Sequence, residues 1–278
     1  MDFSFLEAMI YGFISGLTEI LPVSSRAHQA LLVQLFNVDA NVHLLDFLVH
    51  AGILIGLLLV CGKQLGRSYH DYQRGRLSRR RNRRSSDIQS VRDFQLFKTA
   101  VIPLILGMLL YSLGNTLIKP LYWVSAFFLL GGIFIHIPIY MPHGNKDSRS
   151  MSRLDGVLIG LGSVLSVLPG VSRIGMLLSV SVGRGADPSQ ALRWALTLSI
   201  PAIIALMGFD VYYMATVGVG SIGFPEIVQS LLSGATAFVG TICAVSLMKL
   251  LSAKASYLNF SYYCWGAAFF TFILCLFI

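Results

Sequence analysis

The chain has 278 residues, of which 55% are hydrophobic and only 12% are charged, and its formal net charge is +8. Soluble domains carry about 25% charged residues, and the mean hydropathy of this chain is +0.71. The composition excludes a soluble globular domain. It predicts an all-α, polytopic membrane protein, since an apolar helix of about 20 residues crosses a bilayer.

The first apolar stretch covers residues 3–36, and Glu19 and Pro22 interrupt it. Proline ends a helix because it lacks an N–H and clashes with the preceding turn. We therefore expect a helix–break–helix hairpin that enters the membrane and leaves on the same side, with its break covered by protein or by a water-filled cavity. The start of the chain is acidic where a signal peptide would be basic, so we expect it to be retained.

Six further stretches are long and apolar enough to span a bilayer, and these are residues 44–62, 97–117, 121–141, 191–217, 226–250 and 257–278. A basic segment, 63–98, follows the first span and holds eleven Lys or Arg and three Asp, which accounts for the net charge of +8. Such a segment is typical of a cytoplasmic loop that obeys the positive-inside rule and contacts anionic lipid. Although its RGRLSRRRNRRSSD core resembles a nucleic-acid patch, we expect no nucleic-acid partner.

Residues 154–183 form a second interrupted stretch, because a Pro-Gly pair near its middle leaves flanks of about 15 residues, too short to cross a bilayer. Each half of the chain then consists of one re-entrant hairpin and three spans. An odd number of spans makes the second half, 154–278, run upside down relative to the first half, 1–141. The pattern predicts one membrane domain with an inverted-topology repeat of six transmembrane helices and two re-entrant hairpins, whose broken helices meet near the midplane.

The two breaks carry the same short motif, LPVSSR at 21–26 and LPGVSR at 168–173. In the first break, Glu19 precedes the proline, and Ser24 and Ser25 follow it where they are well placed to cap the next helix, whose N-terminus attracts anions. His28 comes three residues after Ser25, on the same helix face. A lone His is more often a core residue than a catalyst, but an intramembrane glutamate or arginine is expensive and indicates function by default.

The second break adds Ser172 and Arg173 together with two glycines, Gly170 and Gly175, which allow backbone N–H groups to approach a ligand. Arginine offers a planar fork for phosphate oxygens. A carboxylate, a serine, an imidazole and two arginines at two helix starts predict a phosphate or diphosphate site. Two structural alternatives stay open: an internal ion network of Glu19, His28 and Arg173, and a serine that only caps a helix.

Three further polar residues lie in the spans. Asp46 and His50 share a helix face and form either a proton relay or, as we favour, a structural pair, whereas Asp210 either pairs or faces a cavity. The four cysteines lack metal-ligand spacing, so we interpret them as packing residues.

These motifs carry a family likeness. The chain resembles the bacterial undecaprenyl-diphosphate phosphatase family of the bacitracin-resistance type, whose motifs read about as EGxTExxPVSSxxH and PGxSRSG. Here they stand as SGLTEILPVSSRAH at 15–28 and PGVSRIG at 169–175. Weaker matches at 45–56, 194–210 and 234–251 extend the likeness over nearly the whole chain.

The resemblance implies a multi-pass enzyme of the bacterial inner (plasma) membrane that removes one phosphate from a C55 polyprenyl diphosphate and so recycles the lipid carrier for cell-wall synthesis. It implies activity aided by a divalent cation, Mg²⁺ or Ca²⁺, and no organic cofactor. By motif position, Glu19 is the acid/base or metal-linked carboxylate, and Arg173 clamps the phosphate. Ser25 or His28 is the nucleophile or its activator, a choice that stays open. The substrate-binding candidates are Ser24, Arg26, Gly170, Ser172 and Gly175.

Three positions depart from the family pattern. Ser15 replaces the first glutamate, Arg26 replaces the usual threonine, and Ile174 replaces a serine. The first two changes make the site more positive, which favours an anionic head group and weakens the expectation of a metal held by paired carboxylates, with Glu19 left as the motif's one metal candidate. A polyprenyl-phosphate transporter on the same fold is the alternative function, because inverted repeats serve alternating access. Whether the protein forms a homodimer stays open.

Overall fold

The computed structural model of the protein describes residues 4–37, 43–77, 85–118, 120–141, 144–218, 223–252 and 256–277. Across these residues the chain is helical and forms no β-strand beyond one isolated bridge. The first half contains α1 (Phe5–Ile20), α2 (Ser25–Leu35), α3 (His43–Leu77), α4 (Ser85–Met108), α5 (Tyr111–Ile118), α6 (Leu121–His136) and the 3₁₀ turn η1 (Ile137–Tyr140). The second half contains α7 (Arg153–Val164), η2 (Leu165–Val167), α8 (Arg173–Gly183), α9 (Pro188–Val217), α10 (Phe224–Ser252), η3 (Ser256–Asn259) and α11 (Phe260–Phe277).

Five helical segments within the described ranges are long and apolar enough to cross a membrane, and these are His43–Arg74, Leu121–Tyr140, Pro188–Thr216, Phe224–Ser252 and Ser256–Phe277. They coincide with five of the six predicted spans. The outer surface suits lipid, since α11 leaves Phe269 and Phe272 67% and 52% exposed. Apolar surface of this extent is unfavourable in water. The protein is a multi-pass membrane protein.

The sixth predicted span, 97–117, is not one helix. Helix α4 ends at Met108, and the N–H groups of Leu109 and Leu110 turn back to the carbonyls of Leu106 and Gly107 at 3.2 and 3.0 Å. These i→i−3 bonds tighten the chain into a 3₁₀-type turn before α5 begins. The residues around the turn, 104–111, are apolar and gave no sign of it. The break places Tyr111 over the site described below.

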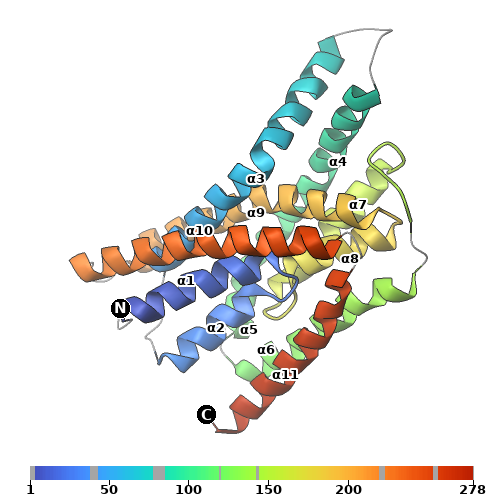
Figure 1. The fold of residues 1–278 in the computed structure, drawn as a ribbon. Coiled ribbons are helices and arrows are strands. Elements are labelled where there is room, and N and C mark those ends of the chain that lie inside the picture. Colours follow the sequence, from blue (N-terminus) through green and yellow to red (C-terminus); the bar gives the residue numbers. More distant parts are fainter. Residues whose placement is uncertain are drawn as a thin grey trace.

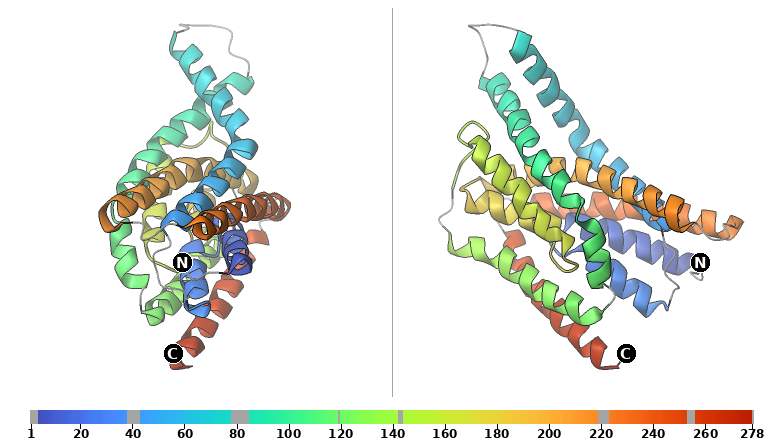
Figure 2. Two further views of the ribbon diagram at one scale, coloured as in Figure 1. Left: turned by 90° about the vertical axis from the view of Figure 1, so that its left-hand side faces the viewer. Right: turned by 180° about the vertical axis from the view of Figure 1, so that it is seen from behind.

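The predicted basic loop, 63–98, is also mostly helical. Helix α3 continues to Leu77 and α4 begins at Ser85, while residues 78–84 lie outside the described ranges. The two helices run side by side past the rest of the bundle (Figures 1 and 2). Long Arg, Lys and Gln side chains are good helix formers, and the Lys98 ammonium donates to the Tyr72 hydroxyl at 2.7 Å across the pair.

The two halves of the chain pack through corresponding helices. Helix α1 lies along α10, and its counterpart α7 lies along α4, while α3 packs on α9 and α6 on α11 (Figure 1). Glycines make the first two contacts close: a Cβ at Gly16 would lie within 3.0 Å of the Ala237 carbonyl, and one at Gly160 would meet that of Ala100 in the same way. Small residues four apart are typical of tight helix pairs in membranes.

Candidate active site

The first break is a strained turn between α1 and α2. Leu21 is extended, and Ser24 has φ 64° and ψ 96°, a left-handed φ that costs a non-glycine residue about 1–3 kcal/mol. The prediction that the serines cap α2 is wrong, because Ser24 makes no side-chain cap and Ser25 is already the first helical residue. The Ser24 hydroxyl instead accepts the N–H of Gly170 at 3.1 Å, from the other break.

The second break supplies the matching half of this contact. Gly170 has φ +131°, which an L side chain rarely adopts, and a Cβ there would lie within 3.0 Å of the Phe128 nitrogen. Ser172 caps α8 by accepting the N–H of Gly175 at 3.1 Å, and its hydroxyl donates to the Leu21 carbonyl at 3.4 Å. The loops that carry the repeated motif therefore touch each other inside the bundle.

A buried ion pair joins the two breaks. One oxygen of Glu19 accepts from Arg173 Nη2 and the other accepts from the Ser25 hydroxyl. The Arg173 and Glu19 side chains are only 7% and 6% exposed, so each charge needs the other to offset its desolvation. The Arg173 Nε is buried without a hydrogen-bond partner in the described part of the chain. Such a group calls for an explanation, and an acceptor supplied by a ligand is one.

A pocket of ≈ 30 Å³ lies between the breaks. Its polar lining consists of Thr18, Glu19, Ser24, Ser25, Arg26, Tyr111, Ser166, Ser172 and Arg173. Counted from Pro22 and Pro169, the pairs at equivalent motif positions are Glu19 with Ser166, Ser25 with Ser172, and Arg26 with Arg173. Each break thus contributes one arginine and one serine from the same places in its motif.

Not every predicted site residue reaches this pocket. His28 lies one turn along α2, where its Nδ1 contacts the Ser24 carbonyl at 2.8 Å and its Nε2 contacts the Tyr263 hydroxyl at 2.7 Å. Gly175 is held in the cap of α8, and Gly170 joins the breaks without lining the pocket. The spacing predicts that His28 lies on the same face of α2 as Ser25. The residue is one turn further along the helix, however, where it contacts Tyr263 of α11 instead of the pocket.

Sequence reasoning missed three polar lining residues, Thr18, Tyr111 and Ser166. Tyr111 lies inside the predicted span 97–117, and nothing in the sequence marked it as a site residue. Ser166 had a signal that was available, because it stands three residues before Pro169, as Glu19 stands before Pro22.

A larger cavity of ≈ 350 Å³ adjoins the pocket, and Arg26 and Tyr111 line both. Asp46 and Asp210 line the cavity too. The favoured pairing of Asp46 with His50 is wrong: Asp46 accepts from Tyr11 at 2.6 Å on α1, and His50 pairs with Asp210 at 2.7 Å on α9. These bonds tie α1, α3 and α9 together beside the cavity.

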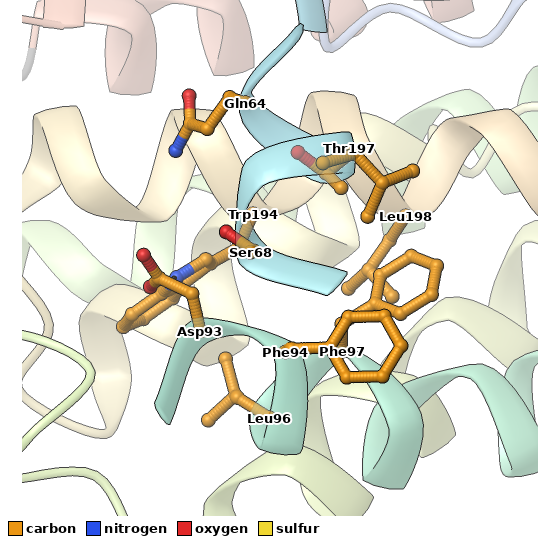
Figure 3. Close-up of a pocket in the computed structure, with 10 residues that line it drawn as sticks. Gln64, Ser68, Asp93, Phe94, Leu96, Phe97, Trp194, Thr197 and Leu198 are labelled. Atoms are coloured by element: carbon orange, nitrogen blue, oxygen red, sulfur yellow. Dashed lines mark hydrogen bonds between the residues drawn. The ribbon is translucent and has the colours of Figure 1, made fainter. Parts of the chain in front are cut away.

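A third pocket lies away from the breaks, between α3, α4 and α9 (Figure 3). Its ≈ 20 Å³ holds about one water. Asp93 accepts from the Trp194 indole at 3.1 Å and from Gln190 at 3.2 Å, and the Phe94 and Phe97 rings stack at 5.9 Å. No predicted site residue lines it, so we regard it as a packing feature.

The residues of the first pocket do not fit a protein-held divalent cation. Of the carboxylates in the described ranges, Glu19 alone lines this pocket, and both of its oxygens already accept hydrogen bonds. Ser15, one turn earlier, is fully buried and accepts from Gln29 at 3.3 Å. No group of three His, Cys, Asp or Glu in the described ranges could hold a metal, whereas Mg²⁺ and Ca²⁺ prefer several oxygen ligands.

The family of the chain follows from comparison with known proteins. A model of the family "Bacitracin resistance protein BacA" matches residues 8–270, so the chain belongs to this family of membrane proteins. Among curated relatives, Undecaprenyl-diphosphatase 2 of Halalkalibacterium halodurans is 26% identical, over 97% of this chain and 95% of its own length. The undecaprenyl-diphosphatases of Desulforapulum autotrophicum and Treponema denticola are each 29% identical, covering 93% and 95% of this chain and 94% and 99% of their own lengths. The resemblance inferred from the two motifs is confirmed.

Proposed function

We propose that this protein is a membrane phosphatase that removes the terminal phosphate of undecaprenyl diphosphate and so recycles the lipid carrier for cell-wall synthesis. The carrying observation is a buried Arg173 Nε without a partner in the described part of the chain, on a guanidinium that lines a pocket with Glu19 and Ser25. Phosphate oxygens supply the acceptors that such a guanidinium lacks. The names of the relatives favour hydrolysis over transport of the same lipid.

The contacts suggest how the residues divide the reaction. Arg173 holds the terminal phosphate, and Ser25 attacks its phosphorus while Glu19 accepts the hydroxyl proton. The bond from that phosphorus to the bridging oxygen breaks, and undecaprenyl phosphate leaves with the proton from Glu19. A water molecule, deprotonated by Glu19, then attacks the phosphoserine, and Ser25 regains a proton as inorganic phosphate is released. Phosphoryl transfer depends on positioning and charge, which a pocket with two arginines supplies.

Ser24, Ser172 and Gly170 have supporting parts in this proposal, because their hydrogen bonds join the two breaks. His28 is a positioning residue, since it contacts the Ser24 carbonyl and lies outside the pocket. The choice between Ser25 and His28 as nucleophile therefore falls on Ser25.

The membrane arrangement is part of the proposal. Residues 1–141 and 154–278 form an inverted repeat, with α1–α2 and α7–α8 as re-entrant hairpins. Its support is that the first helix of each hairpin packs on a helix of the other half, α1 on α10 and α7 on α4. The basic segment 63–98 lies in the cytoplasm, as the positive-inside rule requires.

Phosphate release from C55 diphosphate by the purified protein in nanodiscs tests the function. Ser25→Ala and Arg173→Ala are expected to lower release by at least about 1,000-fold, since each removes a group that acts on the transferred phosphate. His28→Gln is expected to retain release within about tenfold. A dead His28→Gln with an active Ser25→Ala would reverse the assignment of the nucleophile. If the parent releases no phosphate but binds C55 phosphate through Arg173, transport replaces hydrolysis.

A further inference from the structure

Arg26 is the second arginine that lines the pocket between the breaks. It occupies the motif position in the first break that Arg173 occupies in the second, and both line the pocket. The Arg26 guanidinium lies 4.1 Å from the centroid of the Tyr111 ring, and its Nη1 donates to the Val167 carbonyl at 3.0 Å. Stacking on an aromatic face and a bond to the opposite break both fix the plane of the guanidinium.

A neighbouring glycine leaves room for this guanidinium. A Cβ at Gly114, on α5, would lie within 3.0 Å of the Val167 carbonyl oxygen and of both terminal nitrogens of Arg26. Any larger residue at this position displaces Arg26 or the second break. The turn that ends α4 brings both Gly114 and Tyr111 to this side of the pocket. Three separate segments, α2, α5 and η2, therefore shape the space that holds the Arg26 guanidinium.

The lining of the pocket is positively charged. Glu19 contributes −1, and Arg26 and Arg173 contribute +1 each, so the lining carries a formal net charge of +1. The donor set described above does not fit a protein-held divalent cation. A guanidinium placed before binding serves the same electrostatic purpose as a cation, because it stabilises charge that develops on the phosphoryl oxygens.

We propose that Arg26, together with Arg173, supplies the positive charge for binding and hydrolysis of the diphosphate, so that this protein works without a divalent cation. The inference rests on the proposed function and names the residue that replaces the metal. Arg26 acts on the terminal phosphate from the α2 side, and Arg173 acts from the α8 side.

The test compares the parent with Arg26→Thr, Arg26→Lys and Gly114→Ala, each assayed in chelator and with added Mg²⁺. Two quantities are measured: phosphate release from C55 diphosphate, and binding of C55 phosphate by tryptophan fluorescence. Threonine is the usual family residue, so Arg26→Thr keeps a side chain that the fold accepts. Arg193→Thr, which removes an exposed guanidinium outside the pocket, is the matched control.

In chelator, the parent is expected to release phosphate within twofold of its rate with Mg²⁺. Arg26→Thr should lose about 100-fold in rate, the usual effect of removing one transition-state donor, and should bind C55 phosphate at least about tenfold more weakly. Arg26→Lys should recover only part of the loss because it lacks the planar fork, and Gly114→Ala should behave like Arg26→Thr. Arg193→Thr should match the parent.

Two results overturn the inference and leave the proposed function standing: release by the parent that requires added Mg²⁺, or release and binding by Arg26→Thr in chelator that equal those of the parent. Absence of release from the parent under every condition refutes the proposed function instead. Binding in chelator then still decides the role of Arg26, since unchanged binding by Arg26→Thr refutes it.

Discussion

Replacement of one partner of the buried Glu19–Arg173 pair should lower the free energy of unfolding. Replacement of both partners should change it very little. The two side chains are 6% and 7% exposed, and loss of one partner from a buried ion pair costs about 3–5 kcal/mol, whereas replacement of both is often neutral. The pocket of ≈ 30 Å³ beside the pair has room for a water molecule that could solvate the remaining charge. We therefore expect the lower end of this range, about 3 kcal/mol, for Glu19→Gln or Arg173→Met. The double variant should lie within about 1 kcal/mol of the parent.

Unfolding of the four proteins by SDS in mixed micelles, followed by the fluorescence of the three tryptophans, measures these free energies. All three variants should release no phosphate, although the double variant is nearly as stable as the parent. A double variant that is stable but inactive would show that the ion pair serves catalysis and not stability. Additive losses, about 6 kcal/mol in the double variant, would refute the reasoning, because independent sites add and coupled sites do not.

Two other experiments test the break and the topology. Gly170→Ala should destabilise the protein by about 3 kcal/mol or more, since φ is +131° and a Cβ would meet the Phe128 backbone; the same unfolding titration measures it. In a cysteine-free background, a membrane-impermeant thiol reagent applied to intact cells should label Phe224→Cys, a position 79% exposed. It should spare Arg74→Cys, an exposed position in the part of α3 that the proposed topology puts in the cytoplasm.

Both experiments have a control and a result that would contradict the prediction. Gly208→Ala adds a methyl group with nothing within 4 Å and should leave stability unchanged or raise it by up to about 1 kcal/mol. A Gly170→Ala variant as stable as this control would contradict the assigned backbone conformation. Labelling of Arg74→Cys but not Phe224→Cys would reverse the membrane orientation, and labelling of both in permeabilised cells checks that each thiol reacts.

Hydropathy and motif repetition predicted much of the fold and the meeting of the two breaks. Five spans follow from apolar length alone, and the shared LPxxSR pattern identified the segments that touch. The turn at Leu109 was not predictable in the same way, because an apolar sequence looks alike in a straight helix and in a tightened one. The helical ends of α3 and α4 were missed because positive charge reports the side of the membrane and carries little information on backbone conformation.

Side-chain direction limited the prediction of the site. A proline followed by two serines suggested a cap, yet the left-handed Ser24 turns its hydroxyl toward the other break. His28 was assigned from helical spacing, but its partner Tyr263 comes from α11, 235 residues away. Local patterns cannot report such distant partners. Where the two copies of the motif could be compared position by position, as for Arg26 and Arg173, the sequence was informative.

The glycine-lined contacts have a consequence for how the molecule can move. Gly16 fixes α1 against α10, and Gly160 fixes α7 against α4. Each pair consists of one helix from the first half of the chain and one from the second half. The closest helix contacts therefore join the two halves. A rocking motion must carry α1 with α10 as one body and α4 with α7 as another. Neither half, produced alone, would have a surface that covers its glycine face, so the two halves must assemble together.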